Sequence, residues 1–325
     1  MLSSIVRECK AKISPLLTVC PKQLNFISLE RLIRHKSLKL MLIFFGIGIL
    51  LFLGCSSSLQ SQVATDFNND SLKGNYALID KGNGGQPNAG VTLINFDGRG
   101  KFTGSTTQNF PGANAGTRTI AKATFTGNYT LEKQGIGTGQ IITNLPDGST
   151  SENKLNLVVT KAKIIDQKRE AEELFLIPQN LTPANGLETV VAKRLPDEGK
   201  FTNASLQGNY SYTIIGEGGQ SPIAGLGILT CDGKGNCSGN IAINRPGASA
   251  GERTVTTTSS VMPYTINSDG TGTATPPNES EIVLLITKAE VVNDLKVAQE
   301  MFFIVNQLDS ATGNLLKGFV TKISD

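Results

Sequence analysis

The 325-residue sequence contains no tryptophan and a single histidine, and aromatic residues make up only 6% of it. Histidine is the side chain that most often serves as a general acid–base catalyst and as a metal ligand near neutral pH. The one histidine, His35, lies in a basic stretch at residues 31–40, directly before an apolar run. Histidine chemistry therefore depends on whether this N-terminal segment is kept in the finished protein.

The apolar run at residues 41–54 has the sequence MLIFFGIGILLFLG, which is 14 uncharged residues. A helix that crosses a membrane needs about 20 such residues. A basic stretch followed by a short apolar run and a small residue is typical of a secretory signal peptide. We therefore predict that residues 1–54 are a signal peptide that is removed, with an uncleaved membrane anchor as the alternative.

The end of this run, LFLGC at residues 51–55, resembles the lipobox of bacterial lipoproteins, with Phe52 where leucine is usual. The resemblance implies that Cys55 becomes the first residue and carries acyl chains such as palmitate. It further implies a lipid-anchored protein of the cell envelope whose partner is the membrane. Ser56 follows the cysteine, which by the same resemblance implies the outer membrane in a Gram-negative bacterium.

Removal of residues 1–54 changes the charge and the cysteine content of the chain. Eight of the 30 basic residues and two of the 27 acidic residues lie there, which leaves 22 and 25, a net charge near −3. Because no basic cluster with interleaved aromatic residues remains, we expect no nucleic-acid partner. Only Cys231 and Cys237 remain besides Cys55, and an even pair in an exported protein predicts a disulfide.

The rest of the chain contains one unit twice, which identifies an internal repeat. The offset between the copies is 134 residues at the first matching pair, 135 through the middle and 127 near the end. The matching pairs are SLKGNYAL (71–78) and SLQGNYSY (205–212), FDGRGKFTG (96–104) and CDGKGNCSG (231–239), NFPGANAGTRT (109–119) and NRPGASAGERT (244–254), VVTKAKIID (158–166) and LITKAEVVN (285–293), and EELFLI (172–177) and QEMFFI (299–304). The repeat predicts a flexible tether at 55–70, a first domain at 71–195, a linker at 196–203 and a second domain at 204–325.

Short apolar stretches alternate with Gly, Asn, Asp and Pro in both copies, which favours an all-β fold of antiparallel strands. For the first copy we predict strands near 74–80, 89–96, 102–108, 117–125, 127–132, 138–143, 154–165, 172–180 and 188–194, with a helical turn as the alternative for KREAEE at 168–173. Eight or nine strands in each domain leave a barrel and a sandwich open. Gly74-Asn75-Tyr76 and its equivalent at 208–210 resemble the Gly-x-Trp start of lipocalin- and avidin-like barrels, which implies a small closed meander.

Two cross-strand pairings follow from the repeat. Phe96 and Phe102 flank a predicted Asp-Gly hairpin turn, and Cys231 and Cys237 flank the equivalent turn. If flanking residues face each other, the aromatic pair of one copy becomes a bonded pair in the other. A second hairpin would place Lys opposite Glu in both copies, which predicts the ion pairs Lys161–Glu173 and Lys288–Glu300, either exposed and structural or buried and functional.

The loop P-G-A-[NS]-A-G-x-R occurs in both copies and is the candidate binding loop. Two glycines let backbone N–H groups converge and an arginine follows at a fixed distance, which suits a carboxylate, a phosphate or a sugar acid. The alternative is a wide turn whose arginine packs over an edge strand or pairs with an acid. The residues of the loop are Pro111, Gly112, Gly116 and Arg118 in the first copy and Pro246, Gly247, Gly251 and Arg253 in the second.

No nucleophile motif, phosphate-binding loop or metal-ligand series accompanies these features, so we expect no enzyme activity, no metal and no cofactor. The four tyrosines at strand starts, Tyr76, Tyr129, Tyr210 and Tyr264, are interpreted as core or barrel-plug residues. The leading hypothesis is a membrane-anchored envelope lipoprotein with a non-enzymatic binding or structural role, with an envelope glycan or a protein as partner. The alternative is a carrier of a small apolar ligand in a barrel lumen, and an envelope enzyme is the third.

Overall fold

The computed structural model describes residues 66–83, 87–112, 117–180, 187–219, 221–249, 251–277, 279–308 and 313–324. Residues 64–325 form one compact unit. Cys55 and the predicted signal peptide lie outside the described residues. None of the helical segments in the described part of the chain is long and apolar enough to cross a membrane.

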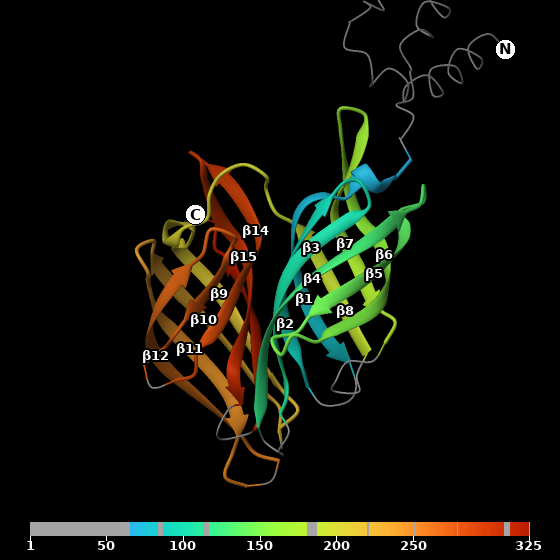
Figure 1. Ribbon diagram of the computed structural model, residues 1–325. Coiled ribbons are helices and arrows are strands. Elements are labelled where there is room, and N and C mark those ends of the chain that lie inside the picture. Colours follow the sequence, from blue (N-terminus) through green and yellow to red (C-terminus); the bar gives the residue numbers. More distant parts are fainter. Residues whose placement is uncertain are drawn as a thin grey trace, which may run out of the picture. The chain divides into compact units, whose positions relative to one another are not determined.

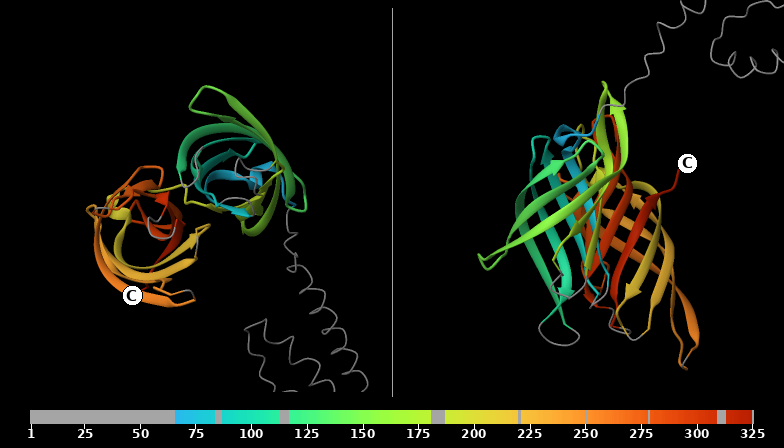
Figure 2. Two further views of the ribbon diagram at one scale, coloured as in Figure 1. Left: turned by 90° about the horizontal axis from the view of Figure 1, so that it is seen from below. Right: turned by 90° about the vertical axis from the view of Figure 1, so that its right-hand side faces the viewer.

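Each repeat forms a closed barrel of eight antiparallel strands (Figure 1). The first barrel consists of β1 (Lys73–Asn83), β2 (Ala89–Asp97), β3 (Lys101–Pro111), β4 (Arg118–Leu131), β5 (Ile136–Asn144), β6 (Thr150–Ile165), β7 (Lys168–Pro178) and β8 (Leu187–Arg194). The second consists of β9 (Gln207–Glu217), β10 (Ile223–Asp232), β11 (Asn236–Pro246), β12 (Arg253–Ile266), β13 (Thr271–Ala274), β14 (Ile282–Val292), β15 (Leu295–Leu308) and β16 (Leu315–Lys322). Consecutive strands pair, and β1 with β8 and β9 with β16 close the two rings, which appear end-on in Figure 2.

The all-β prediction and the small closed meander implied by the Gly-x-aromatic resemblance are therefore confirmed, and the choice between barrel and sandwich is settled as barrel. Two local predictions were wrong. The strands predicted at 117–125 and 127–132 are one strand, β4, because Gly127 pairs with Phe102 across the sheet and interrupts nothing. The segment 168–173 is not a helical turn but the start of β7, after a two-residue turn in which Asp166 and Gln167 have positive φ.

A short 3₁₀ helix precedes each barrel, η2 (Asn69–Ser71) and η3 (Asn203–Ser205), and a tyrosine from the barrel wall holds each one. The Tyr129 hydroxyl donates to the carbonyl oxygens of Asn69 and Leu72 at 2.9 and 2.8 Å. The Tyr264 hydroxyl donates to the carbonyl oxygens of Asn203 and Leu206, both at 2.9 Å. Since Leu72 and Leu206 are buried, each helix and the leucine after it plug one end of a barrel.

The two barrels pack against each other through the outer sides of their walls. Ala77, Ile79, Ala89 and Val91 of β1 and β2 point away from the first barrel's interior but are buried, in one hydrophobic cluster with residues of the second barrel. The partner strands are β14 and β15. Lys193 and Glu300 form an ion pair across this interface, with Nζ 2.5 Å from Oε2. The repeats are thus joined by a buried apolar contact.

Candidate functional site

The predicted disulfide is present, and its place in the barrel follows the register argument. Cys231 and Cys237 are directly opposed on β10 and β11 and are bonded to each other. In the first barrel, Phe96 and Phe102 are the opposed pair, and their ring centroids lie 5.6 Å apart. Both pairs are buried inside their barrels. The same register therefore holds a packed pair in one copy and a covalent pair in the other.

The predicted Lys–Glu hairpins have the expected register in both copies. Lys161 is opposite Glu173 on β6 and β7, although a bulge at Glu172 lets Lys161 Nζ pair with that carboxylate at 3.0 Å instead. Lys288 is opposite Glu300, with Nζ 3.7 Å from Oε1. Both lysine side chains are more than half exposed, so these are surface ion pairs, worth at most about 1 kcal/mol.

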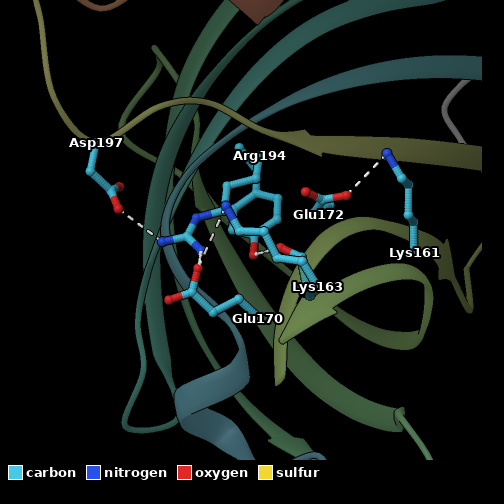
Figure 3. A network of polar contacts seen from close by, with 8 residues as sticks. Lys161, Lys163, Glu170, Glu172, Arg194 and Asp197 are labelled. Atoms are coloured by element: carbon cyan, nitrogen blue, oxygen red, sulfur yellow. Dashed lines mark hydrogen bonds and ion pairs between the residues drawn. The ribbon is translucent and has the colours of Figure 1, made fainter. Parts of the chain in front are cut away.

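A larger polar network lies near Lys161, where β7 and β8 meet the segment that leaves the first barrel (Figure 3). The guanidinium of Arg194 lies between the carboxylates of Glu170 and Asp197 and pairs with both, at 2.8 Å in the case of Asp197. Gly74 has a φ of +98°, and a Cβ there would be 2.6 Å from Asp197 Oδ1. Gly208, the equivalent glycine, also has a positive φ of +105° but no carboxylate of the described residues near it, so the backbone conformation is what requires glycine in the Gly-x-Tyr motif of both copies.

In the predicted binding loop, the two arginines brace their own barrels in the same way. Arg118 Nε donates to Asn109 Oδ1 at 2.6 Å, and its Nη2 donates to the Pro87 carbonyl oxygen at 2.7 Å. Arg253 repeats both contacts with Asn244 and Pro222, each at 2.7 Å. Burial lowers the pKa of Arg118 to about 10, which leaves it charged at neutral pH.

Of the other loop residues, Gly116 lies outside the described residues. Pro111 and Pro246 end β3 and β11. The backbone N–H of Gly112 bonds to the carbonyl of Thr117 at 2.9 Å, and the N–H of Gly247 bonds to that of Glu252 at 2.8 Å. Gly251 has a φ of +83°. These contacts close the loop on itself, while ligand binding by the loop stays a prediction.

A site that the sequence did not single out is the interior of the second barrel, which encloses a cavity of about 780 Å³. At its closed end lie Leu206, Tyr264 and the disulfide. Along its walls the lining is mainly apolar and comes from seven strands, β9 to β12 and β14 to β16. The apolar wall residues include Ile214, Leu229, Ile241, Ile243, Met262, Ile282, Leu284, Met301, Phe303, Val305 and Leu308.

Polar groups also line the cavity, and they occupy defined levels. Ser260 and Thr258 of β12 lie partway along the wall. Tyr212 of β9 also lines the cavity, and its hydroxyl makes no hydrogen bond within the described part of the chain. Burial raises the pKa of Tyr212 to about 12, and the charge of Glu279 adds to the shift. At neutral pH this hydroxyl is therefore protonated and able to donate a hydrogen bond.

The open end of the lumen carries the charged groups. Arg245 lies near the end of β11, and Glu279 and Glu281 lie in the segment that leads into β14. Gln307 of β15 completes this rim and accepts a hydrogen bond from Ser280 Oγ at 3.1 Å. The cavity thus runs from an apolar closed end to a polar, charged mouth.

The equivalent interior of the first barrel is crossed by aromatic rings. Phe125 is the counterpart of Ser260, and its ring centroid lies 6.2 Å from that of Phe102. These two rings lie over glycines of the facing strand, because a Cβ on Gly104 would be 2.3 Å from Phe125 and one on Gly127 would be 2.2 Å from Phe102. The sequence signal for the second lumen was therefore the loss of phenylalanine at aligned positions.

The fold and the lumen define the class of protein: two closed eight-stranded antiparallel β-barrels in tandem, the second with a largely apolar cavity. No protein-family model matches the sequence, and no curated protein matches it significantly. In the part of the chain that the structure describes, no group of His, Cys, Asp and Glu side chains is placed to hold a metal ion.

Proposed function

We propose that the second barrel binds a small, elongated, mainly apolar molecule in its lumen. The observation that carries this proposal is the cavity of about 780 Å³, which falls within the roughly 300–1,000 Å³ of small-molecule sites. The apolar-carrier alternative of the sequence analysis thereby becomes the leading one. The role is binding without catalysis, and the first barrel acts as the packed support of the second.

The lining supports a ligand with an apolar body and one polar end. The apolar body would gain about 25 cal/mol for each Å² removed from water against Ile241, Met262 and their neighbours. A polar end would lie at the mouth, close to Arg245, Glu279 and Glu281. A molecule that is charged at its buried end would leave an unpaired charge in the lumen, which is costly. The lumen is thus suited to a chain- or ring-like apolar molecule with a single polar group.

We also propose that the protein is held at the cell envelope by acyl chains on Cys55, in the outer membrane if the organism is Gram-negative. The support is the lipobox-like segment 51–55 after a basic and apolar leader. Acyl labelling of the wild-type chain beside Cys55→Ala tests this proposal. Label on the wild type alone is expected, and equal labelling of the two chains, or none on either, would contradict it.

The lumen proposal is tested on residues 64–325, which form one compact unit with both hydrophobic cores. Native mass spectrometry of this segment is expected to show a retained small molecule, or one bound equivalent of N-phenyl-1-naphthylamine after addition. This uncharged apolar dye fluoresces when it leaves water. A chain that carries no ligand and takes up no dye would overturn the proposal.

A further inference from the structure

The interface between the two barrels uses two different outer faces, which we define by their strands. The β1–β2 face of the first barrel contributes Ala77, Ile79, Ala89 and Val91, all buried. The β14–β15 face of the second barrel contributes Leu285, Phe302 and Ile304, all fully buried. Because the two faces differ, the contact joins unlike surfaces of two like domains, as a head-to-tail interface does.

Since the barrels are repeats, each face has a counterpart in the other copy, and both counterparts are exposed. Leu226 and Ile228 on the β9–β10 face correspond to Val91 and Leu93, and are 66% and 56% exposed. The β6–β7 face of the first barrel carries the counterparts of Leu285, Phe302 and Ile304.

These counterparts on the β6–β7 face are apolar, like the buried residues that they match. Val158 corresponds to Leu285 and is 39% exposed, Phe175 corresponds to Phe302 and is 38% exposed, and Ile177 corresponds to Ile304 and is 47% exposed. Aliphatic and aromatic side chains grouped on an outer strand surface mark an interaction site more often than isolated ones do. Each molecule thus exposes two apolar faces that are equivalent to the two faces buried in its internal interface.

One hydrogen bond of the internal interface also has a counterpart in the second barrel, where the donor group has no acceptor in the described part of the chain. Asn109, held by Arg118, is fully buried and its Nδ2 donates to the carbonyl oxygen of Val305 in the second barrel at 2.7 Å. Asn244 is held by Arg253 in the same way, but it is exposed and its Nδ2 has no acceptor among the described residues. The arginine of the repeated loop therefore presents a docking amide in both barrels, and only the first is used within the chain.

We propose that the β9–β10 face of one molecule docks on the β6–β7 face of a second copy of this chain, repeating the internal interface between molecules. Asn244 then donates to the backbone of β7, as Asn109 does to β15. The association is head-to-tail, so it forms a ring if the rotation closes and a filament if it does not. It is independent of ligand binding in the lumen.

The intermolecular contact is weaker than the internal one for three reasons. Ser211 and Thr213 stand where Ala77 and Ile79 are buried, which reduces the apolar area. Thr321 stands in place of Lys193, so the Lys193–Glu300 ion pair is not repeated with Glu173, the equivalent of Glu300. The internal contact also benefits from the covalent connection between the barrels, which raises the effective concentration.

The test uses the full chain in a non-ionic detergent and follows its mass by sedimentation velocity. Protein concentrations from about 1 to about 200 μM cover contacts with micromolar dissociation constants. Two variants each disable one face with a charge, Leu226→Glu and Phe175→Glu. Val261→Glu is the matched control, because Val261 is 54% exposed on β12 and belongs to neither face. Circular dichroism confirms that each variant keeps its barrels.

We expect the wild type and Val261→Glu to form species larger than a dimer, and each face variant alone to be monomeric. An equimolar mixture of the two face variants is expected to form dimers and nothing larger, since only one productive pair of faces remains. A monomeric wild type across the whole range would overturn the proposal. Association that survives in either face variant alone would overturn it too, because it would involve other surfaces or a symmetric contact.

Discussion

The two barrels share their register, their plugs and their tyrosine contacts, yet their interiors differ. In the first barrel Phe96, Phe102 and Phe125 meet in the interior. In the second barrel the aligned residues are Cys231, Cys237 and Ser260, and a cavity of about 780 Å³ lies beside them. The comparison shows that aligned inward positions carry phenylalanine rings in one barrel and smaller side chains beside a cavity in the other, while the hydrogen-bonded wall stays the same.

The largest effect is expected from removing a ring from the packed interior. Phe96 is 1% exposed and contacts the rings of Tyr76, Phe102 and Tyr129. Phe96→Ala should lower the free energy of unfolding of residues 64–325 by about 3–5 kcal/mol, because it leaves a cavity in a packed core. Urea unfolding measures this. A loss below about 1 kcal/mol would show that the first barrel is not packed as described.

The disulfide between Cys231 and Cys237, which is aligned with Phe96 and Phe102, should contribute less to the free energy of unfolding. The disulfide closes a loop with a sequence separation of 6 residues, so the double variant Cys231→Ala plus Cys237→Ala should lose at most about 2 kcal/mol. The same urea experiment, with and without reductant, checks this value. A loss as large as that of Phe96→Ala would mean that the covalent pair carries the second barrel's core, against the comparison.

The plugs should behave alike in both barrels. Tyr129→Phe and Tyr264→Phe each remove a hydroxyl that donates to two carbonyl oxygens of the plug segment. Each is expected to cost about 1–2 kcal/mol, since buried acceptors lose their donor. Thermal unfolding of the two variants side by side is the measurement. Unequal losses of more than about 1 kcal/mol would show that the hollow barrel depends on its plug in a different way.

The smallest effect concerns the ion pair that joins the barrels. Burial raises the pKa of Glu300, but the hydrogen bond and charge of Lys193 and the charge of Lys288 outweigh it, so the net pKa lies below its ordinary value. A lowered folded-state pKa contributes stability above the unfolded value of about 4.3, and that contribution is lost as the pH falls through the folded pKa. Lys193→Met should therefore cost up to about 1 kcal/mol at pH 7.

That variant should also lose part of its sensitivity to acid. Unfolding midpoints measured between pH 7 and pH 3 are expected to converge for the wild type and Lys193→Met as Glu300 is protonated in both. A constant gap over the whole pH range would show that Lys193 acts through its aliphatic stem and not through its charge.

Much of the fold was predictable from local signals. The repeat gave the domain count, and the Asp-Gly turns gave the register that places Cys231 opposite Cys237. The closure of each barrel was implied only by the Gly-x-Tyr resemblance and not by a local pattern, because the pairing of β1 with β8 joins residues more than a hundred positions apart. Strand β4 was predicted as two strands separated at Thr126, but it is continuous, and the neighbouring Gly127 is covered by the Phe102 ring.

The site and the interface between barrels needed the structure for a different reason. Which side chains face inward follows only from the register of the closed barrel. Before that register was known, the change from Phe125 to Ser260 could not be linked to a cavity. A partial signal for the interface was present in IVLLI at 282–286, an unbroken apolar run that indicates a strand buried on both sides. The aligned residues 155–159, LNLVV, keep a polar position, as expected for a strand exposed on one side.

The most direct test of the cavity in the second barrel is to replace Ser260 by phenylalanine, the residue at the equivalent position of the first barrel. Ser260→Phe places a phenyl ring over Gly239, as Phe125 lies over the equivalent Gly104 in the first barrel. This ring should fill part of the lumen without unfolding the barrel. Titration of residues 64–325 with N-phenyl-1-naphthylamine is predicted to show at least about tenfold weaker binding for the variant, a loss of about 1.4 kcal/mol, at an unchanged unfolding midpoint. Equal dye binding by the wild type and the folded variant would contradict the account.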